Sequence, residues 1–381
     1  MNMRIVSGNN FRKAVFAAAL LPALTGIGVA APKEAKIGFA FSITQGAASY
    51  GETQTNGAKL AIDEINAQAG QDGIKIVPVF EDDASQPQQG VNVFNKLIAA
   101  DRVVMIIGPT LSNTAQAADR FAQKAGVPVL AISNTAKGIT DIGDFIFRDS
   151  LTEMDVIPNT IRVAKEKLGI KKVAVLYGND DAFTKSGYDV FKKSLGDFNV
   201  EVLSEQIFAK GDRDFSPQLT QIRTINPDAL IVSALVEEAS GIVSQARQLG
   251  ISVPIIGGNG FNSPALMKNA GKAAENVIVG ASWNAASPNM LNQKFVQAYT
   301  ARYGSPPDQF AAQAYAGVYI AREALGRAGS VDDRKALRDA LAQIKNLDTV
   351  LGKFSFTDSR DADHTPVVQV VKDGKFAVFG E

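Results

Sequence analysis

The sequence predicts an α/β protein built from two doubly wound, parallel-sheet lobes. Short β-rich runs alternate with amphipathic helical stretches along the chain, an order that places helices on both faces of a parallel sheet. The same alternation starts again after Ser150 as a second copy of the architecture. Beyond an N-terminal leader, about 350 residues exceed what one core usually supports at about 150 residues per domain. We therefore expect two domains.

Four predicted strands open the first lobe, over residues 36–41, 74–80, 103–107 and 127–131. Helical periodicity fills the intervals between them. Leu60, Ala61 and Ile65 fall on one face of a helix over 56–66, and the same spacing recurs at Val91, Phe94 and Leu97. These helices connect strands that run parallel.

The second lobe repeats the pattern, with predicted strands at residues 172–177, 200–208, 229–234, 253–256 and 276–281. Residues 291–345 are helical in pattern, and Lys372-Asp373-Gly374-Lys375 is typical of a hairpin turn between two final strands. We expect the chain to return to the first lobe and then cross again, which gives a multi-crossing hinge near Ser150, Ser282 and Phe356. The predicted limits are 31–150 with 283–355 for lobe 1 and 151–282 with 356–381 for lobe 2.

The N-terminus has the pattern of a signal peptide. Three basic residues precede an uncharged apolar run over 14–29 that is short and interrupted by Gly and Pro. Gly28 and Ala30 are small residues of the kind that signal peptidase requires, so we expect residues 1–30 to be removed. Cleavage after Ala31 and an uncleaved anchor are the alternatives. The chain has no Cys, hence no disulfide and no lipidation site, and we expect an exported protein free in a Gram-negative periplasm.

Composition argues against catalysis and nucleic-acid binding. Loss of the leader removes three basic residues and leaves a net charge of −3, without a basic patch for nucleic acid. One His and no Cys leave no material for a Ser-His-Asp or Cys-His site, and no P-loop, dinucleotide fingerprint or metal-ligand spacing occurs. We predict no enzyme activity, no cofactor and no metal. His364 is expected in an exposed loop, and the Asp82-Asp83 pair is interpreted as a solvated strand exit rather than an acid/base pair.

Polar residues at two strand exits point to an anion site. Ser112, Asn113 and Thr114 stand where strand 103–107 turns into a helix, and we expect Ser112 to be the N-cap. The free N–H groups of a helix N-terminus hold a carboxylate without any Arg or Lys. Ser133 and Thr135 occupy the next strand exit and add a hydroxyl and another amide. The alternative is that all of these are ordinary caps and turn residues.

At these residues the sequence resembles the branched-chain amino-acid-binding proteins, which are type I periplasmic binding proteins of ABC importers. The resemblance covers nearly the whole mature chain, and its motifs are specific only when taken together. They are Ala35-Lys36-Ile37-Gly38, Tyr50-Gly51, the run from Asn56 to Asn66, Asp82-Asp83, Ile107-Gly108-Pro109 and Ser244-Gln245-Ala246-Arg247.

The resemblance implies that two lobes close around a ligand whose carboxylate is held mainly by the first lobe. On this sequence the carboxylate site falls on Ser112, Ser133 and Thr135, with Tyr50 at the cleft. Family members close the second lobe over the ligand with aromatic groups, for which Phe183 is the equivalent here, and Leu235 stands where some members carry an aromatic. Phe310 and Trp283 are expected to line the apolar end of the pocket, with a place in the core as the alternative.

One departure from the family concerns the ligand ammonium. Where amino-acid binders place a carboxylate for it, this chain has Asn259. A buried ammonium without an anionic partner is costly. Either an acid substitutes, or the ligand has no amino group. The candidate acids are Glu237, Glu238, Asp180 and Asp181.

We expect a monomeric substrate-binding component of an ABC importer, with a membrane permease as its partner and a hydrophobic or branched-chain amino acid as its ligand. The first alternative is the same kind of protein for a non-amino small carboxylate such as an aromatic acid. The second is a protein that presents its ligand to a chemoreceptor or sensor. Turnover of a bound ligand would identify an enzyme instead.

Overall fold

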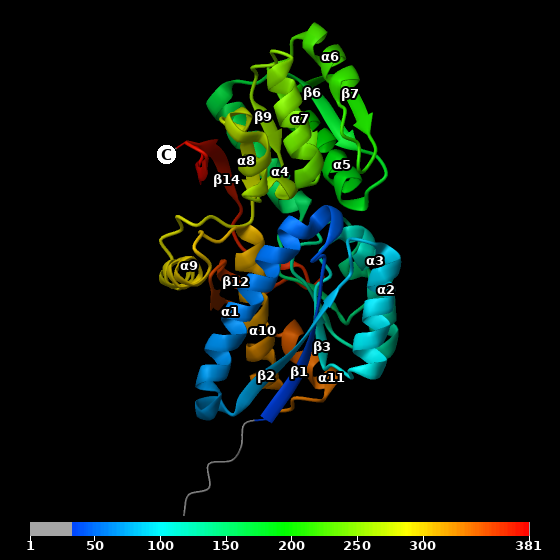
Figure 1. Cartoon of the computed structure of the whole chain (residues 1–381), viewed down its shortest axis with the longest axis vertical. Coiled ribbons are helices and arrows are strands. Elements are labelled where there is room, and N and C mark those ends of the chain that lie inside the picture. The colour runs from blue at the N-terminus through cyan, green and yellow to red at the C-terminus, as the bar shows by residue number, and fades with distance from the viewer. Residues whose placement is uncertain (1–32, 381) are drawn as a thin grey trace, which may run out of the picture. The chain divides into compact units, whose positions relative to one another are not determined.

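A computed structural model describes residues 33–380, apart from the side chains of residues 70–72. These residues belong to one compact unit that contains two large sheets with helices packed on them (Figure 1). We call the five-stranded sheet with its helices lobe 1 and the seven-stranded sheet with its helices lobe 2. The predicted two-lobed α/β architecture is confirmed. The predicted signal peptide, residues 1–30, lies outside the described residues.

Lobe 1 is built on a parallel sheet in the order β2-β1-β3-β4-β5. Its strands are β1 (Lys33–Phe41), β2 (Ile74–Asp82), β3 (Met105–Ile107), β4 (Val129–Ala131) and β5 (Ile146–Arg148). Its helices are α1 (Ala48–Asp72), α2 (Pro87–Asn95), α3 (Ser112–Ala125), α10 (Gln309–Ala328) and α11 (Arg334–Ala342). Lobe 1 also contains three short helical turns, which are η1 (Gln45–Ala47), η2 (Lys96–Ala100) and η3 (Thr140–Ile142). The four predicted strands are present with shifted ends, whereas β5 carries no prediction.

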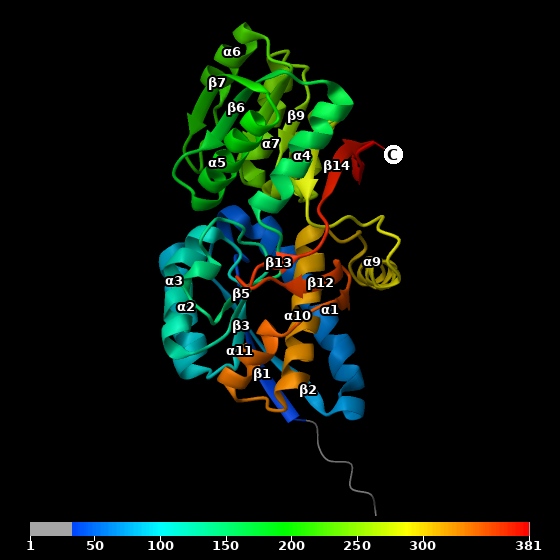
Figure 2. The same cartoon turned by 180° about the vertical axis from the view of Figure 1, so that it is seen from behind.

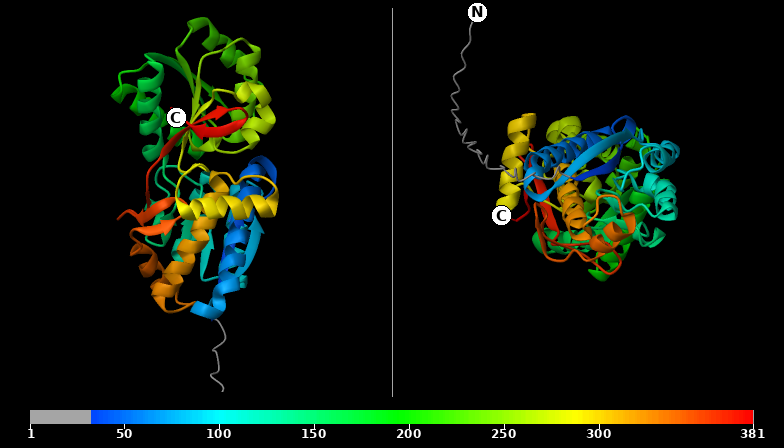
Figure 3. Two further views of the ribbon diagram at one scale, coloured as in Figure 1. Left: turned by 90° about the vertical axis from the view of Figure 1, so that its left-hand side faces the viewer. Right: turned by 90° about the horizontal axis from the view of Figure 1, so that it is seen from below.

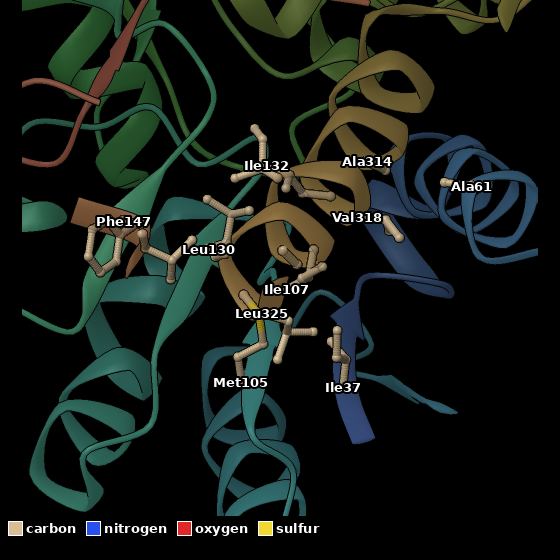
Figure 4. Close-up of a cluster of buried hydrophobic side chains, with 14 of the residues drawn as sticks. Ile37, Ala61, Met105, Ile107, Leu130, Ile132, Phe147, Ala314, Val318 and Leu325 are labelled. Atoms are coloured by element: carbon tan, nitrogen blue, oxygen red, sulfur yellow. The ribbon is translucent and has the colours of Figure 1, made fainter. Parts of the chain in front are cut away.

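The core of lobe 1 follows from alternation along the strands. Met105 and Ile107 point to the face covered by α1, α10 and α11, whereas Ile106 between them points to the face covered by α2 and α3. On the first face, Val318 and Leu325 of α10 pack over the strand residues (Figure 4). Because both faces are covered, the strands read as nearly continuous apolar runs.

Lobe 2 repeats this plan with a sheet in the order β15-β14-β10-β9-β8-β6-β7. The inner strands run parallel, and the C-terminal hairpin adds two antiparallel strands at one edge. The strands are β6 (Lys172–Gly178), β7 (Glu201–Phe208), β8 (Ala229–Ser233), β9 (Ile255–Gly257), β10 (Ile278–Ala281), β14 (Val367–Lys372) and β15 (Lys375–Val378). The helices are α4 (Glu153–Leu168), α5 (Ala182–Asp197), α6 (Ser216–Ile225), α7 (Val236–Gln248) and α8 (Ala265–Ala270), with turns η4 (Asn259–Phe261) and η5 (Gly271–Ala274). The predicted strands and the hairpin are confirmed.

The chain crosses between the lobes three times. It leaves lobe 1 between β5 and α4, at Ser150, and returns after β10, at Ser282, into α9 (Met290–Tyr303), which packs against α1 (Figure 3). The small sheet of β11 (Leu347–Thr349), β12 (Gly352–Phe356) and β13 (Ala362–Asp363) comes next (Figure 2).

The third crossing does not lie at Phe356, as the sequence pattern predicted. The ring of Phe356 contacts the ring of Phe147 in lobe 1 at 5.2 Å between centroids. Asp361, farther along, pairs with the buried Arg148 guanidinium at 2.6 Å. The chain therefore stays with lobe 1 through β13 and reaches lobe 2 at β14. The predicted domain limits as a whole stay a prediction.

The expectation that His364 lies in an exposed loop is wrong. Both ring nitrogens of His364 are buried, and its ring lies 6.4 Å from that of Phe354 between centroids. Burial disfavours the imidazolium and lowers the pKa of His364 to about 4. The residue is part of the third crossing, and its ring is turned inward although its neighbours Asp363 and Thr365 are exposed.

Candidate ligand-binding site

A small cavity lies between the lobes at the carboxyl ends of their parallel strands. Doubly wound sheets bind their ligands at this end of the strands. The volume of the cavity is about 20 Å³, enough for about one water molecule. Seven of the eight residues singled out from the sequence line it, namely Tyr50, Ser112, Ser133, Phe183, Leu235, Asn259 and Phe310. Thr110, Leu111 and Gly260 complete the lining. Thr135 is buried beside the cavity but is not part of its wall.

Ser112 is the first residue of α3 rather than its N-cap, which corrects the sequence-based expectation. The N-cap is Leu111, and the Ser112 hydroxyl accepts a hydrogen bond from the Ala136 N–H at 3.2 Å instead. This bond ties the exit of β3 to the exit of β4. The first-turn N–H groups of α3 have no acceptor within the helix, so its N-terminus carries a partial positive charge beside the cavity.

The hydroxyl of Ser133 is oriented by a chain of hydrogen bonds within lobe 1. It donates to the Thr110 carbonyl at 2.8 Å and accepts from the Gln54 amide of α1 at 2.7 Å. The Thr110 hydroxyl in turn donates to Gln54 Oε1 at 2.6 Å. Because each group fixes the next, the polar wall of the cavity is held rigid before any ligand arrives.

Tyr50 on α1 bridges the two lobes. Its hydroxyl donates to the Gly260 carbonyl at 2.6 Å and accepts from the Val236 N–H at 2.7 Å, and both partners belong to lobe 2. Burial raises the pKa of Tyr50 well above its usual value, which keeps the hydroxyl protonated and able to donate. Gly260 leaves no room for a side chain within lobe 2, since a Cβ there would lie 2.3 Å from the Ala234 carbonyl oxygen.

Aromatic and aliphatic side chains form the apolar part of the wall. The ring of Phe310 lies 4.3 Å from that of Tyr50 between centroids, and Phe183 and Leu235 are buried across the cavity in lobe 2. Trp283, expected beside Phe310, is not part of this wall. Its indole N–H donates to Asn292 and its ring packs edge-on against Phe295, so the core alternative holds for Trp283.

The side chain of Asn259 is fully engaged with protein groups. Its amide donates to Glu153 Oε1 at 2.9 Å and to the Leu151 carbonyl at 3.3 Å. Its carbonyl oxygen accepts from the Ser282 hydroxyl and from Gln309 Nε2. These partners come from the first two inter-lobe crossings and from α10, so Asn259 joins two of the segments on which a hinge depends.

Glu153 is the acidic member of this network; it lies behind Asn259 and is not itself part of the cavity wall. Nothing in the sequence pattern singled it out. It is 1 % exposed at the start of α4, and its Oε1 also accepts from the Thr135 hydroxyl at 3.1 Å. Desolvation raises the pKa of Glu153 to about 7, against the lowering effect of hydrogen bonds from Asn259 and Thr135. Near neutral pH the carboxyl is therefore poised between its charged and neutral forms.

None of the four acids proposed from the sequence lines the cavity. Asp181 caps α5 by accepting from the Phe183 and Thr184 N–H groups, Asp180 accepts from the Lys210 N–H, and Glu238 accepts from the Gly211 N–H. Glu237 lies on the exposed side of the first turn of α7. Asp180 and Glu238 hold loops of lobe 2, whereas Asp181 also accepts from the Asn113 side-chain amide of α3 at 3.0 Å and so joins the two lobes.

The interpretation of Asp82-Asp83 as a solvated strand exit is wrong for Asp83. Its side chain is buried and accepts from the Ser42 hydroxyl at 2.6 Å and the Ser85 N–H at 2.9 Å. Asp82 accepts from the Ile43 N–H at 2.9 Å. Together the two carboxylates fix the loop after β1, which leads into α1 and positions Tyr50.

Two parallel-sheet lobes with a lined cavity between them define a ligand-binding clamp. A family model described as periplasmic binding protein matches residues 34–375, and the chain belongs to that family. Its structure is similar to that of the branched-chain amino acid transporter substrate-binding protein LivJ from Streptococcus pneumoniae in complex with isoleucine, with a TM-score of 0.85, 31% identity, and coverage of 90% of this chain and 98% of that one.

Two further relatives differ in what their names say they bind. A Leu/Ile/Val-binding protein of Rhizobium johnstonii is 28% identical over 331 residues, which cover 85% of this chain and 88% of the relative. A solute-binding protein of an ABC transporter from Rhodopseudomonas palustris BisB5, solved in complex with 3,4-dihydroxy benzoic acid, has a TM-score of 0.82 at 28% identity, with 90% and 95% of the two chains covered. In the described part of this chain, no helix has the length and apolar character needed to cross a membrane.

Replacing Tyr50 with Phe should loosen the contact between the lobes. The change removes the two hydrogen bonds of the Tyr50 hydroxyl to lobe 2 and leaves the Val236 N–H without its acceptor, at a cost of about 1 kcal/mol or more. Amide exchange in residues 234–240, measured by mass spectrometry, should accelerate about fivefold or more. Tyr303→Phe is the matched control, because the Tyr303 hydroxyl donates to Asn56 within lobe 1. Equal protection of this segment in Tyr50→Phe and the control would contradict the bridging role.

The buried carboxyl of Glu153 should make stability depend on pH. Its folded pKa of about 7 lies above the ordinary value of 4.5, so the folded state binds more protons between these pH values. The free energy of unfolding should therefore fall as pH rises from about 4.5 to 7, by up to roughly 3 kcal/mol from this group. Chemical denaturation of wild type and Glu153→Gln across this range isolates the effect as the difference between the two curves. A constant difference would contradict the raised pKa.

Proposed function

We propose that the chain is the substrate-binding component of an ABC importer and that its lobes close on a hydrophobic or branched-chain amino acid. The observation that carries the amino-acid assignment is the buried carboxyl of Glu153 in hydrogen-bond contact with a residue of the cavity wall. Membership of the periplasmic binding protein family supports the clamp. The isoleucine complex of a 31% identical relative supports the ligand class.

The ligand carboxylate would bind at the N-terminus of α3. Ser112 and Ser133 line the cavity at two adjacent strand exits, and the free N–H groups of the first turn of α3 favour an anion there. No Arg or Lys lines the cavity, so hydroxyls and amides are the groups available to a carboxylate. Thr135 would not touch the ligand; its hydroxyl would position the Glu153 carboxyl by donating a hydrogen bond to it.

The ligand ammonium would pair with Glu153. A cation beside this carboxyl favours its charged form and lowers its pKa, which recovers free energy that burial costs the protein. The Asn259 amide, which donates to Glu153 Oε1, holds the carboxyl in place. In this role Glu153 substitutes for the carboxylate that Asn259 does not supply.

The hydrophobic side chain would rest against Tyr50, Phe183, Leu235 and Phe310. A cavity of about 20 Å³ is smaller than any such side chain, so binding requires the lobes to separate and then to close on the ligand. Contacts from lobe 2 are complete only in the closed arrangement. Ligand binding therefore shifts the population toward closure.

The second candidate is a carboxylate without an amino group, such as an aromatic acid. The complex of a 28% identical relative with 3,4-dihydroxy benzoic acid favours it. So does the raised pKa of Glu153, because the neutral carboxyl offers a hydrogen bond and no repulsion to a second carboxylate. The two candidates demand opposite charge states of one residue.

The remaining features belong to the same proposal. Residues 1–30 would be a cleaved signal peptide, and the mature chain a periplasmic monomer that delivers its ligand to a membrane permease without chemical change. Lobe 1 would carry the carboxylate site and lobe 2 the closing wall, with a hinge at the three crossings. Delivery to a chemoreceptor or sensor uses the same clamp, and binding to a permease in reconstituted vesicles distinguishes the two.

Calorimetric titration across pH tests the ligand class. For leucine, affinity should rise with pH up to about 7, by as much as tenfold per pH unit, because the ammonium needs a charged Glu153. For the keto acid with the same side chain, 4-methyl-2-oxopentanoate, affinity should stay nearly constant below about pH 6 and fall above about pH 7, because this ligand needs the protonated carboxyl of Glu153. In Glu153→Gln the pH dependence of both affinities should flatten. This variant distinguishes the contribution of Glu153 from that of Asp308, because burial also raises the pKa of Asp308 to about 7.

Each outcome assigns the ligand. A rising leucine profile identifies the amino acid, and tight keto-acid binding with a falling profile identifies the second candidate. If neither compound binds, the amino-acid proposal fails. If leucine binds with the same pH slope in wild type and Glu153→Gln, Glu153 is not the partner of its ammonium.

A further inference from the structure

A second, larger hollow adjoins the cavity. It is an open bay of about 750 Å³, lined mainly by lobe 2, with Gln45 and Gly46 of η1 closing it from lobe 1. Leu235 belongs to the lining of both the bay and the small cavity, and it is the one residue that they share. The two hollows are therefore separated at this side chain.

The position of Leu235 suits a partition. It precedes α7 in extended conformation, at the exit of β8, and its side chain is 6 % exposed. A Leu side chain has staggered positions about two bonds, so a change of rotamer is the movement that would open this partition. Its size sets how far the cavity extends toward the bay.

The chemistry of the bay differs from that of the cavity. Phe215 is buried and forms an apolar floor, whereas Glu237, Ser240 and Ser244 line the bay from successive turns of α7. The two serine hydroxyls donate to the Val236 and Ser240 carbonyls, so towards the bay they act as acceptors. Charges of both signs line the rim, with Lys210 and Arg213 against three carboxylates.

Several of the rim charges already have partners. Lys210 lies 3.7 Å from Asp181, and Glu238 accepts from the Gly211 N–H. A neutral end group that both donates and accepts hydrogen bonds fits this surface better than a hydrocarbon or a single charge.

We propose that the binding cleft continues past Leu235 into this bay, and that the protein accepts amino acids whose side chains are longer than that of leucine and end in a neutral polar group. This inference rests on the proposed function, because it places the carboxylate and ammonium at the α3 and Glu153 end. The side chain of the bound amino acid would extend past Leu235, and its polar end group would bind among the polar residues of α7. Leu235 sets the length limit, and the bay sets the preference for a polar end.

The test compares leucine, norleucine and citrulline by calorimetry. Citrulline has a long side chain with a neutral ureido end, and norleucine has a long side chain with no polar end. Wild type should bind citrulline within about tenfold of leucine and more tightly than norleucine, since a polar site left without its hydrogen bonds discriminates strongly. Leu235→Ala should raise citrulline affinity relative to leucine, and Leu235→Phe should lower it, each about tenfold.

Ser244→Tyr provides the control variant within the bay. Ser244 lines the bay but not the cavity, so the bulky ring should weaken citrulline about tenfold and leave leucine affinity unchanged. Melting temperatures confirm that each variant is folded. If leucine binds but the citrulline-to-leucine ratio is the same in wild type and all three variants, the extended cleft is refuted. If wild type binds none of the three amino acids, the proposed function and the extended cleft both fail.

Discussion

The hydroxyl of Tyr50 is the contact on which the closed site depends. It carries one hydrogen bond to each of two loops of lobe 2, and those loops, the exit of β8 and the turn η4, bring Leu235, Asn259 and Gly260 to the cavity. A buried hydroxyl without these partners would cost about 1–3 kcal/mol, so the lobes meet in an arrangement that satisfies it. The carboxylates of Asp82 and Asp83, at the end of β2, serve the same end by fixing the loop that leads into α1.

The second constraint is the carboxyl of Glu153. Burial makes its charged form expensive, and the hydrogen bonds from Asn259 and Thr135 offset only part of that cost, so its pKa stays near 7. A ligand ammonium would offset the remaining cost of the buried charge on Glu153, whereas a ligand without an ammonium would leave the carboxyl protonated. Because Asn259 also bonds to the first two inter-lobe crossings, the charge at Glu153 and the position of the hinge are coupled through one side chain.

The sequence predicts the fold and the anion side of the cavity for a topological reason. Strands that alternate with helices must run parallel, and their carboxyl ends then gather at one edge, so Ser112 and Ser133 could be placed together without knowledge of a single contact. The other predicted wall residues came from the family resemblance, namely Tyr50, Phe183, Leu235, Asn259 and Phe310. Short strands with no alternation, such as β5 and β11, gave no such signal. The third crossing was misplaced because the sequence around Phe356 predicts a strand but does not indicate which sheet that strand joins.

Burial of polar side chains was the part that sequence could not supply. Asp83 and His364 look like surface residues by type, and only tertiary contacts bury them. Glu153 follows a strand that was missed and sits in the first turn of a helix, where acids are common for local reasons. Its role arises from Asn259, which is 106 residues away in the chain.

Closure of the two lobes around the ligand is the central claim, and an inter-lobe distance tests it most directly. The chain has no Cys, so Lys124→Cys on α3 and Lys193→Cys on α5 give two unique sites for spin labels, one in each lobe. Pulsed electron resonance should give a longer or broader distance distribution without leucine and a shorter, narrow one with saturating leucine. The same distribution in both conditions, with leucine bound, would contradict closure.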